Sequence, residues 1–246
     1  MTTVVRVEDI SFAYGETPAL TDVSLAIEAG EFIGLIGPNG SGKTTLLHLM
    51  LGLLTTDVGS VEVFGEPIEA FDDGHRIGYV SQQSTTKSAS MPVTVREVVE
   101  MGRFAAVGSR RLSEADHRTV DDALATVGID ELQHRRVNAL SGGQRQRAFI
   151  ARALASDADL LALDEPAVGV DADSRDRFYG LLDRLNADGM TVILIEHDIG
   201  VVTDRADRIA CLNRELYHHG DTESFVASDA LAEAYGAESK VVHHQH

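Results

Sequence analysis

Apolar and polar residues form two different patterns along the chain. Short continuous apolar runs predict strands at Phe32–Ile36, Ile77–Val80, Leu160–Leu163, Thr191–Ile195 and Arg208–Leu212. Between them, apolar residues recur every three or four positions. One such helix is expected to begin near Ser174, and its apolar face holds Phe178, Leu181, Leu182 and Leu185. Strands that alternate with amphipathic helices are typical of an α/β domain.

The region from about Ser84 to Arg147 has a different pattern. Helical spacing, as in Val95, Val98 and Val99, is frequent there, and strand-like runs are few. We interpret 84–147 as a helical subdomain inserted into a core formed by 1–83 and 148–215. After Asn213 the pattern predicts a short hairpin with Glu215–His219 as its return strand, so that 216–246 holds the hairpin and a small helical tail. Residues 1–246 then form a single domain.

The amino-acid composition and the net charge limit the classes of protein to which this chain can belong. The chain has 246 residues, with 39 acidic against 21 basic ones and a net charge of −18, which disfavours nonspecific binding to nucleic acid. No apolar run approaches the roughly 20 residues needed to span a bilayer, and the first residues lack a signal-peptide pattern. The single Cys211 allows no intrachain disulfide. We expect a soluble intracellular protein without a nucleic-acid partner.

Lysine is scarce in this sequence. Lys43, Lys87 and Lys240 are the three lysines, and the other eighteen basic residues are arginines. An acidic excess with few lysines resembles proteins of halophilic cells, because at about 1 M salt the Debye length is only about 3 Å and acidic self-repulsion is screened. Codon usage that favours arginine is the alternative explanation. We expect a halophilic protein.

A glycine-rich segment follows the first predicted strand. Gly37-Pro38-Asn39-Gly40-Ser41-Gly42-Lys43-Thr44 matches the pattern G-x-x-x-x-G-K-[ST] of phosphate-binding loops, and Thr45 continues into a helix expected to end near Gly52. The loop amides and the helix N-terminus attract phosphate. Lys43 is expected to reach the β- and γ-phosphates of ATP and Thr44 to ligate Mg²⁺. A simple tight turn would explain the glycines but not Lys43 and Thr44.

Two carboxylates end the predicted strand at Leu160–Leu163. Asp164 is placed to hold the hydration shell of Mg²⁺, and Glu165 beside it can act as a general base on an attacking water. Acidic pairs at strand ends are usually just solvated. Together with the glycine-rich loop, however, they indicate hydrolysis of a nucleoside triphosphate.

The segment Leu140-Ser141-Gly142-Gly143-Gln144-Arg145-Gln146-Arg147 has the spacing of a capping box, in which Ser141 and Gln144 cap a helix. By itself it could be a capped helix with nothing bound. It resembles the signature motif of the ABC transporter ATPases, and the resemblance covers nearly the whole chain. That family implies an α/β fold: a P-loop NTPase (RecA-like) core with N-terminal antiparallel β strands and an inserted α-helical subdomain.

The resemblance also implies roles for residues outside these motifs. Tyr14 matches the aromatic residue that stacks on adenine, although burial in the core is the alternative. Gln82, beside Gln83, matches the glutamine that contacts Mg²⁺ and the attacking water. Asp171 matches an aspartate that bridges two protomers, and His197 matches the histidine that contacts the γ-phosphate.

Partners follow from the same resemblance. Two copies are expected to form a homodimer around two ATP molecules, so that Ser141, Gly142, Gly143 and Gln144 of one copy face the γ-phosphate held by the other. Separate integral membrane permease subunits would hold this chain on the inner face of the cell membrane, and an extracellular substrate-binding protein would act indirectly. An apolar docking groove for the permease is suggested by Val95, Val98, Val99 and Met101, with internal packing as the alternative.

Similarity to a group of related ATPases, and not a residue that contacts the substrate, indicates what is transported. Gly169-Val170-Asp171, Phe178–Leu182, His197–Val202 and Ala210–Arg214 are similar to segments of zinc and manganese importer ATPases. Importers of iron chelates or cobalamin, and a soluble ATPase of iron–sulfur cluster assembly, are the alternatives.

The histidines invite a direct metal-binding hypothesis. They occur as His218-His219 and as His243, His244 and His246, and could form a metal sensor. We favour the alternative, in which they are solvated residues of a turn and of a frayed tail.

Overall fold

The computed structural model describes residues 2–81, 92–108, 110–167 and 170–236. The chain divides into two compact units. The first unit comprises residues 1–70 together with 195–246, and the second comprises residues 71–194.

The first unit combines an antiparallel sheet with a second group of strands. The antiparallel sheet has the order β2-β1-β4-β5 and the second group the order β10-β9-β3. The strands are β1 (Thr3–Tyr14), β2 (Thr17–Glu28), β4 (Val58–Val63) and β5 (Glu66–Pro67) in the sheet, and β3 (Phe32–Ile36), β9 (Arg208–Asn213) and β10 (Glu215–Asp221) in the second group. The N-terminal antiparallel strands that the resemblance implied are confirmed.

The core of the first unit surrounds β3, every residue of which is buried. Strand β3 runs parallel to β9, with Ile36 opposite Cys211. The glycine-rich loop begins directly after Ile36, at the carboxyl end of β3. Helix α1 (Lys43–Met50) follows that loop and buries the predicted apolar residues Leu46, Leu47, Leu49 and Met50. The predicted strand and helix on either side of the loop are therefore confirmed.

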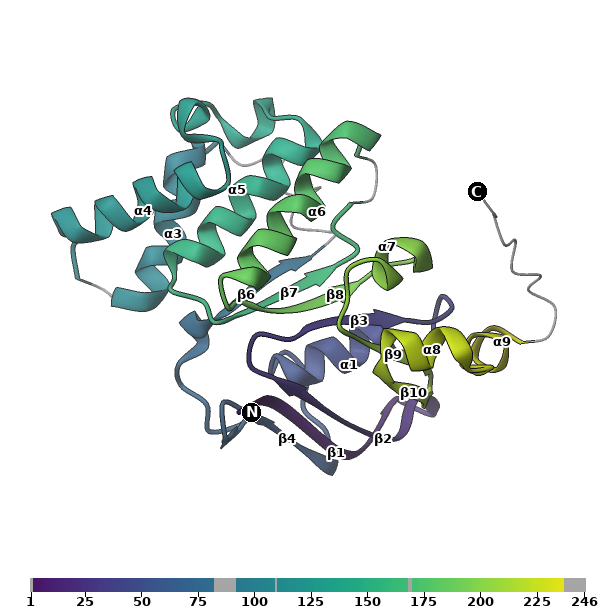
Figure 1. Ribbon diagram of the computed structural model, residues 1–246. Helices are drawn as coiled ribbons and strands as arrows, with labels where there is room; N and C mark the ends of the chain where they lie inside the picture. Colours follow the sequence, from purple (N-terminus) through teal and green to yellow (C-terminus); the bar gives the residue numbers. More distant parts are fainter. Residues whose placement is uncertain (1, 82–91, 109, 168–169, 237–246) are drawn as a thin grey trace. The chain divides into compact units, whose positions relative to one another are not determined.

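The C-terminal part of the first unit is a hairpin followed by two short helices. Strands β9 and β10 pair antiparallel, with Glu215 opposite Asn213, which confirms the predicted hairpin. Helices α8 (Thr222–Ala227) and α9 (Ala230–Tyr235) lie beside these strands, in yellow in Figure 1, and α7 (Ile199–Thr203) follows the end of β8.

The second unit holds strands and longer helices. Strands β6 (Ile77–Ser81), β7 (Leu160–Asp164) and β8 (Thr191–Ile195) have the order β8-β7-β6. β6 and β7 run parallel with Ser81 opposite Asp164. The helices are α3 (Val95–Val107), α4 (Glu114–Thr126), α5 (Gly142–Ala155) and α6 (Ala172–Ala187), with short 3₁₀ turns at Gly74–Arg76, Asp130–Leu132 and Val137–Ala139.

Sequence-encoded caps set where these helices begin. Capping boxes pair Thr94 with Glu97 at α3, Ser113 with Asp116 at α4, and Ser141 with Gln144 at α5. Each box satisfies backbone N–H groups that the first helical turn leaves unpaired. The capping box predicted at Ser141 and Gln144 is confirmed.

An ion-pair network joins α3 to α4. The buried carboxylate of Asp116 accepts hydrogen bonds from the guanidinium of Arg103, at 2.7 Å, and from that of Arg110, at 2.6 Å. Arg103 also pairs with Asp157, beyond the end of α5. The hydrogen bonds from Arg110, Ser113 and Arg103 hold the pKa of Asp116 well below its ordinary value. Two helices of this unit are thus held by charge as well as by apolar packing.

The helical content predicted for 84–147 is confirmed in its described part, which holds α3, α4 and the start of α5. The two compact units divide near residues 70 and 194 instead. One reason is that α5 is bonded to the segment before β6: the Ser156 hydroxyl donates to the His75 carbonyl at 2.8 Å. The division into a core and a helical subdomain at 84 and 147 stays a prediction.

Two expectations about surface residues are wrong. Val95, Val98 and Val99 do not line a docking groove, because all three are buried where α3 packs on α5; Met101, on the same helix, is 40% exposed. His218 and His219 are not solvated residues of a turn, because both lie half-buried in β10. His243, His244 and His246 lie outside the described residues.

No helix in the described ranges combines the length and the apolar character needed to cross a bilayer. The predicted apolar face of α6 is confirmed, since Phe178, Leu181, Leu182 and Leu185 are all buried.

Candidate functional site

The glycine-rich loop of the first unit encloses a buried positive charge. Lys43 is only 6% exposed, and its Nζ donates to the carbonyl oxygens of Gly37, at 2.8 Å, and Pro38, at 3.0 Å. The Ser41 hydroxyl oxygen is buried and has no hydrogen-bond partner among the described residues. A buried ammonium beside an unsatisfied hydroxyl is suited to bind an anion with several oxygens.

The conformation of this loop depends on glycine. Gly37 has φ +150°, and a Cβ there would lie 1.9 Å from the carbonyl oxygen of Leu212. Gly42, the N-cap of α1, has φ +98°, and a Cβ there would lie 2.6 Å from the carbonyl oxygen of Ala19. Larger residues would push the loop off its neighbours. Asn39 and Gly40, at the tip of the loop, are exposed, as is Thr44 at the start of α1.

The chain braces this loop from behind with residues far away in the sequence. The Arg214 N–H donates to the Ser41 carbonyl at 2.8 Å, and the Asn213 Nδ2 donates to the Ala234 carbonyl at 2.7 Å, which ties α9 to the end of β9. The hydroxyl of Tyr235 hydrogen-bonds the backbone of Gly37, while burial raises the pKa of that tyrosine. The loop is therefore held in place before any ligand arrives.

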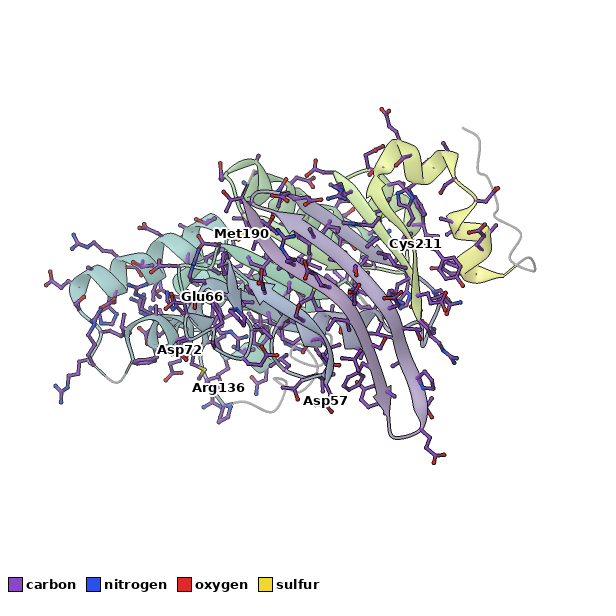
Figure 2. All side chains as sticks on the ribbon, turned by 90° about the horizontal axis from the view of Figure 1, so that it is seen from below. Asp57, Glu66, Asp72, Arg136, Met190 and Cys211 are labelled. Atoms are coloured by element: carbon purple, nitrogen blue, oxygen red, sulfur yellow. The ribbon has the colours of Figure 1, made fainter. Side chains whose placement is uncertain are left out.

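Cys211 belongs to the same layer behind the loop. Figure 2 shows it on β9 beside the C-terminal helices, where its thiol donates to the Ala230 carbonyl at 3.8 Å. Burial raises the pKa of this thiol to about 11, so it packs as a neutral apolar group.

Tyr14 is exposed, contrary to the alternative of core burial. Its side chain is 55% exposed, and its ring stands edge-on to Phe12 with 5.0 Å between ring centroids. The hydroxyl oxygen lies 3.4 Å from Oγ1 of the buried Thr45 on α1. An exposed ring fixed near the helix that follows the loop is suited to stack on a planar base.

His197 lies at the end of β8, between that strand and α7. Its side chain is exposed, and its backbone N–H donates to the carboxylate of the buried Glu196 at 3.1 Å. The next residue, Asp198, caps α7 by accepting from the N–H groups of Gly200 and Val201. The strand end and the capped helix thus fix the backbone that carries His197.

The two predicted carboxylates of the second unit have different environments. Asp164 is buried, 8% exposed, at the end of β7. Burial, followed by the charge of Asp164, raises the pKa of Tyr79 to about 12. Glu165 is half-buried with φ +48°, a left-handed backbone that non-glycine residues rarely adopt. Such strain at a strand end is often found at functional sites.

The Ser141–Gln144 turn is presented to solvent. The Gln144 N–H donates to Oγ of Ser141 at 3.3 Å, and the Ser141 N–H donates to Oε1 of Gln144 at 3.1 Å. Ser141 and Gly142 are exposed. The side chain of Arg145 supports the turn from behind by donating to the Leu140 carbonyl at 3.1 Å.

The structure brings this turn beside Asp171. Gly143 packs so closely on the first turn of α6 that a Cβ there would lie 3.0 Å from Cβ of Ser174. Asp171 caps α6 by accepting from the Ser174 N–H at 2.9 Å, a bond that lowers its pKa. The N-terminal ends of α5 and α6 thus form one exposed edge. Gln82, Gln83, Val168 and Gly169 lie outside the described residues.

Sequence reasoning missed the residues that brace the loop. Asn213, Arg214 and Tyr235 are nearly 200 residues from Gly37, and no local motif marks them. The left-handed backbone of Glu165 was also not predicted. No group of three or more His, Cys, Asp or Glu side chains able to hold a metal ion occurs in the described part of the chain.

Comparison with known proteins agrees with this geometry. The family model described as ABC transporter matches residues 20–168. The chain is 40% identical over 227 residues to the zinc uptake system ATP-binding protein ZurA of Listeria innocua, covering 92% of this chain and 88% of that protein. It is 37% identical over 233 residues to the manganese transport system ATP-binding protein MntB of Bacillus subtilis, covering 94% and 92%.

Among solved structures, the chain is similar to cbiO1 from Clostridium perfringens, part of the ABC transporter complex cbiONQ. The TM-score is 0.81 at 27% identity, over 95% of this chain and 94% of that one.

Proposed function

This chain belongs to the ABC transporter family, and from that premise we propose that it is the ATP-binding and ATP-hydrolysing subunit of an importer for zinc or manganese. The observation that carries the ATPase function is the preformed cradle at Gly37–Thr44, with its buried Lys43 and a Ser41 hydroxyl that no described residue hydrogen-bonds. The names of the most similar relatives support the metal substrate.

ATP fits the glycine-rich loop and Tyr14 of the first unit. The triphosphate would lie against the backbone N–H groups of the loop, with Lys43 neutralising its charge. The exposed Tyr14 ring would stack on the adenine. Thr44, Gln82 and Asp164 carry oxygen groups of the kind that Mg²⁺ prefers. The bound ion would neutralise charge that develops on the phosphate oxygens.

We assign hydrolysis to residues at two strand ends. The Glu165 carboxylate would accept a proton from a water molecule as the water oxygen bonds to the γ-phosphorus and the bond to the β-phosphate oxygen breaks. The His197 side chain would hydrogen-bond the γ-phosphate, and Gln82 would orient the water. A positioned general base contributes about 10²–10⁴ to the rate.

The exposed signature turn is the reason to propose a homodimer. Ser141, Gly142, Gly143 and Gln144 form a helix N-terminus whose first residues, Ser141 and Gly142, are exposed, and a helix N-terminus favours negative charge. In a head-to-tail pair, the turn of one copy would complete the phosphate site of the other, and Asp171 on the same edge would contact the partner. Closing the pair excludes water and strengthens the electrostatic stabilisation of phosphoryl transfer.

A permease would dock on the second unit. A hollow of about 230 Å³ between α3, α5 and β6 is lined by Tyr79, the exposed Met101, and Arg152. An apolar residue at the rim of such a hollow is suited to receive a partner helix. We therefore place the protein at the inner face of the cell membrane, with an extracellular metal-binding protein supplying the permease.

The assignment to zinc or manganese is favoured over iron chelates, cobalamin or iron–sulfur cluster assembly. Relatives named for zinc and for manganese align with more than nine-tenths of this chain. Uptake of zinc, manganese and iron isotopes by a strain that lacks this gene would test the substrate. Loss of iron uptake alone would contradict the proposal.

The ATPase proposal has a sharp test in Glu165→Gln. This variant should bind ATP and dimerise with it, because the cradle and the signature turn are intact, yet hydrolyse it about 10²–10⁴ times more slowly. Size-exclusion chromatography with ATP and a phosphate-release assay measure the two properties. Hydrolysis at the wild-type rate would exclude Glu165 as the general base.

A further inference from the structure

The second unit contains a hollow of about 430 Å³ that the proposed reaction does not use. It lies where the C-terminal end of α4 meets α5 and α6, which run side by side in teal and green in Figure 1. Three arginines line it: Arg147 on α5, and Arg177 and Arg184 on α6. Gly128 and Gly180 also line this hollow, which we call the arginine pocket.

These arginines differ from four others in the second unit that make ion pairs. Arg76, Arg96, Arg103 and Arg110 each pair with a carboxylate. Within the described ranges, no ion pair joins Arg147, Arg177 or Arg184 to an acidic side chain, although α6 itself carries three aspartates and the charge of Arg177 acts on the N-cap Asp171. In a chain with almost twice as many acidic as basic residues, three arginines line one hollow whose lining includes no acidic residue.

Arg147 is held in place at the inner side of the pocket. Its Nη1 donates to the carbonyl oxygens of Val127, at 3.3 Å, and Gly128, at 3.1 Å. Burial, and then the like charge of Arg177, lower the pKa of Arg147. The protein thus places cations close together where they repel each other. An anion among them would remove that repulsion.

Gly180 is an independent sign that this space is kept open. It lies in the interior of α6, where glycine destabilises a helix relative to alanine. Apart from the adjoining residues and backbone of α6 itself, no described atom lies within 4 Å of the position that a Cβ would take, so close packing does not require the glycine. The space that it leaves free belongs to the pocket.

We propose that the arginine pocket binds a small polyanion bearing phosphate groups. A guanidinium group can donate two parallel hydrogen bonds to two oxygens of one phosphate. The volume of the arginine pocket, about 430 Å³, suits a compact ligand. An extended acidic peptide fits less well, because it would pass the aspartates of α6. The ligand would tie α5 to α6, the helices that Ser141 and Asp171 cap. That consequence for ATP hydrolysis rests on the proposed function, whereas the binding itself does not.

The test uses pyrophosphate as the probe, with EDTA present and the Lys43→Ala variant as background, so that binding at the glycine-rich loop is removed. Isothermal titration calorimetry at 0.1 M KCl should detect one site. Adding Arg177→Ala and Arg184→Ala should weaken binding at least about tenfold, since two charged hydrogen-bonding partners are lost. Hydrogen exchange at the first turns of α5 and α6 should slow when pyrophosphate binds.

Matched controls separate the pocket from general charge effects. Arg175→Ala, on the same helix but not in the pocket lining, should leave the affinity unchanged. Gly180→Asp, which adds a carboxylate to the open space, should abolish binding. Absence of binding in the background variant, or equal weakening by Arg175→Ala, would overturn the proposal. Stronger binding of hexaglutamate than of pyrophosphate would overturn it in favour of an acidic peptide.

Discussion

The two compact units each present a turn suited to phosphate, but they hold that turn differently. The loop at Gly37–Thr44 buries Gly37, Ser41 and Lys43, and hydrogen bonds from Arg214, Asn213 and Tyr235 brace it or the segments behind it. The Ser141–Gln144 turn stands in solvent and is held by its own capping box and Arg145. The phosphate loop is braced within the first unit, whereas the signature turn of the second unit faces outward.

The units also differ in charge. The first unit has 20 acidic and 6 basic residues, a net charge of −14, whereas the second has 19 and 15, a net charge of −4. Apolar packing and backbone hydrogen bonds therefore have to hold the first unit together against its own charge. The second unit relies in addition on arginine–aspartate pairs such as Arg103–Asp116.

The difference between the braced loop and the exposed turn suggests how the proposed reaction is controlled. A loop that the fold holds rigid can bind a nucleotide without help, because the entropy cost of ordering it is met when the chain folds. An exposed turn stabilises nothing until a phosphate reaches it from another molecule. Hydrolysis would then depend on association of two copies rather than on binding alone.

The largest expected effect comes from separating the two half-sites. Lys43→Ala removes the cation of the loop, and Ser141→Arg blocks the signature turn. Each variant alone should lose at least about 10²-fold in ATP hydrolysis. Mixed together, they form heterodimers with one intact site, so the mixture should recover roughly a quarter of wild-type activity if subunits pair at random. A phosphate-release assay on the mixture measures this recovery.

The control is each variant mixed with an equal amount of itself, which should stay inactive. If the mixture were no more active than the average of the two variants, the half-sites would not lie on different chains. The comparison between a self-sufficient loop and an outward-facing turn would then fail.

A smaller effect is expected from the brace behind the loop. Tyr235→Phe and Asn213→Ala each remove a hydrogen bond that positions it, worth about 1 kcal/mol, so the affinity for ATP should fall about fivefold. Adenosine binding should not change, because the brace acts on the phosphate loop. Calorimetric titration of both ligands tests this, with Tyr217→Phe as an exposed control. Unchanged ATP affinity with a lower Tm would make these residues purely structural.

Much of this first unit could be predicted from the sequence, because its signals are local. The strand Phe32–Ile36, the loop and the helix after it are adjacent in the chain, and each constrains the next. The brace could not be predicted, because Tyr235 reaches Gly37 only through the fold. In the second unit, periodicity identified the apolar face of Val95, Val98 and Val99. It could not identify α5 as the element that covers that face.

The second unit should be the more sensitive to acid. The pKa of Asp116 lies below its ordinary value, so the ionised carboxylate stabilises the fold at pH values above about 4. This stabilisation is lost as the pH falls below about 4 toward the lowered pKa. Asp116→Asn should lower Tm by several degrees at pH 7 and show a smaller further decrease between pH 5 and pH 3.

Thermal unfolding across this pH range compares the wild type with Asp116→Asn, and Asp130→Asn serves as a control at an exposed carboxylate. Parallel Tm curves for the wild type and Asp116→Asn would show that the ion pairs with Arg103 and Arg110 do not control acid stability.

The smallest expected effect concerns salt, and here the two units should respond unequally. At molar KCl the Debye length shrinks to about 3 Å, so the repulsion within the −14 unit is screened. The same screening weakens the exposed ion pairs of the −4 unit. We expect Tm to rise by a few degrees, about 1–2 kcal/mol, between 0.1 M and 2 M KCl. Hydrogen exchange should slow more in β1, β2 and α1 than in α3 and α4.

Potassium chloride is compared with an equal osmolarity of sucrose, which does not screen charge. Equal stability at both salt concentrations would contradict the halophilic interpretation, and equal protection of the two units would mean that their charge difference has no energetic consequence.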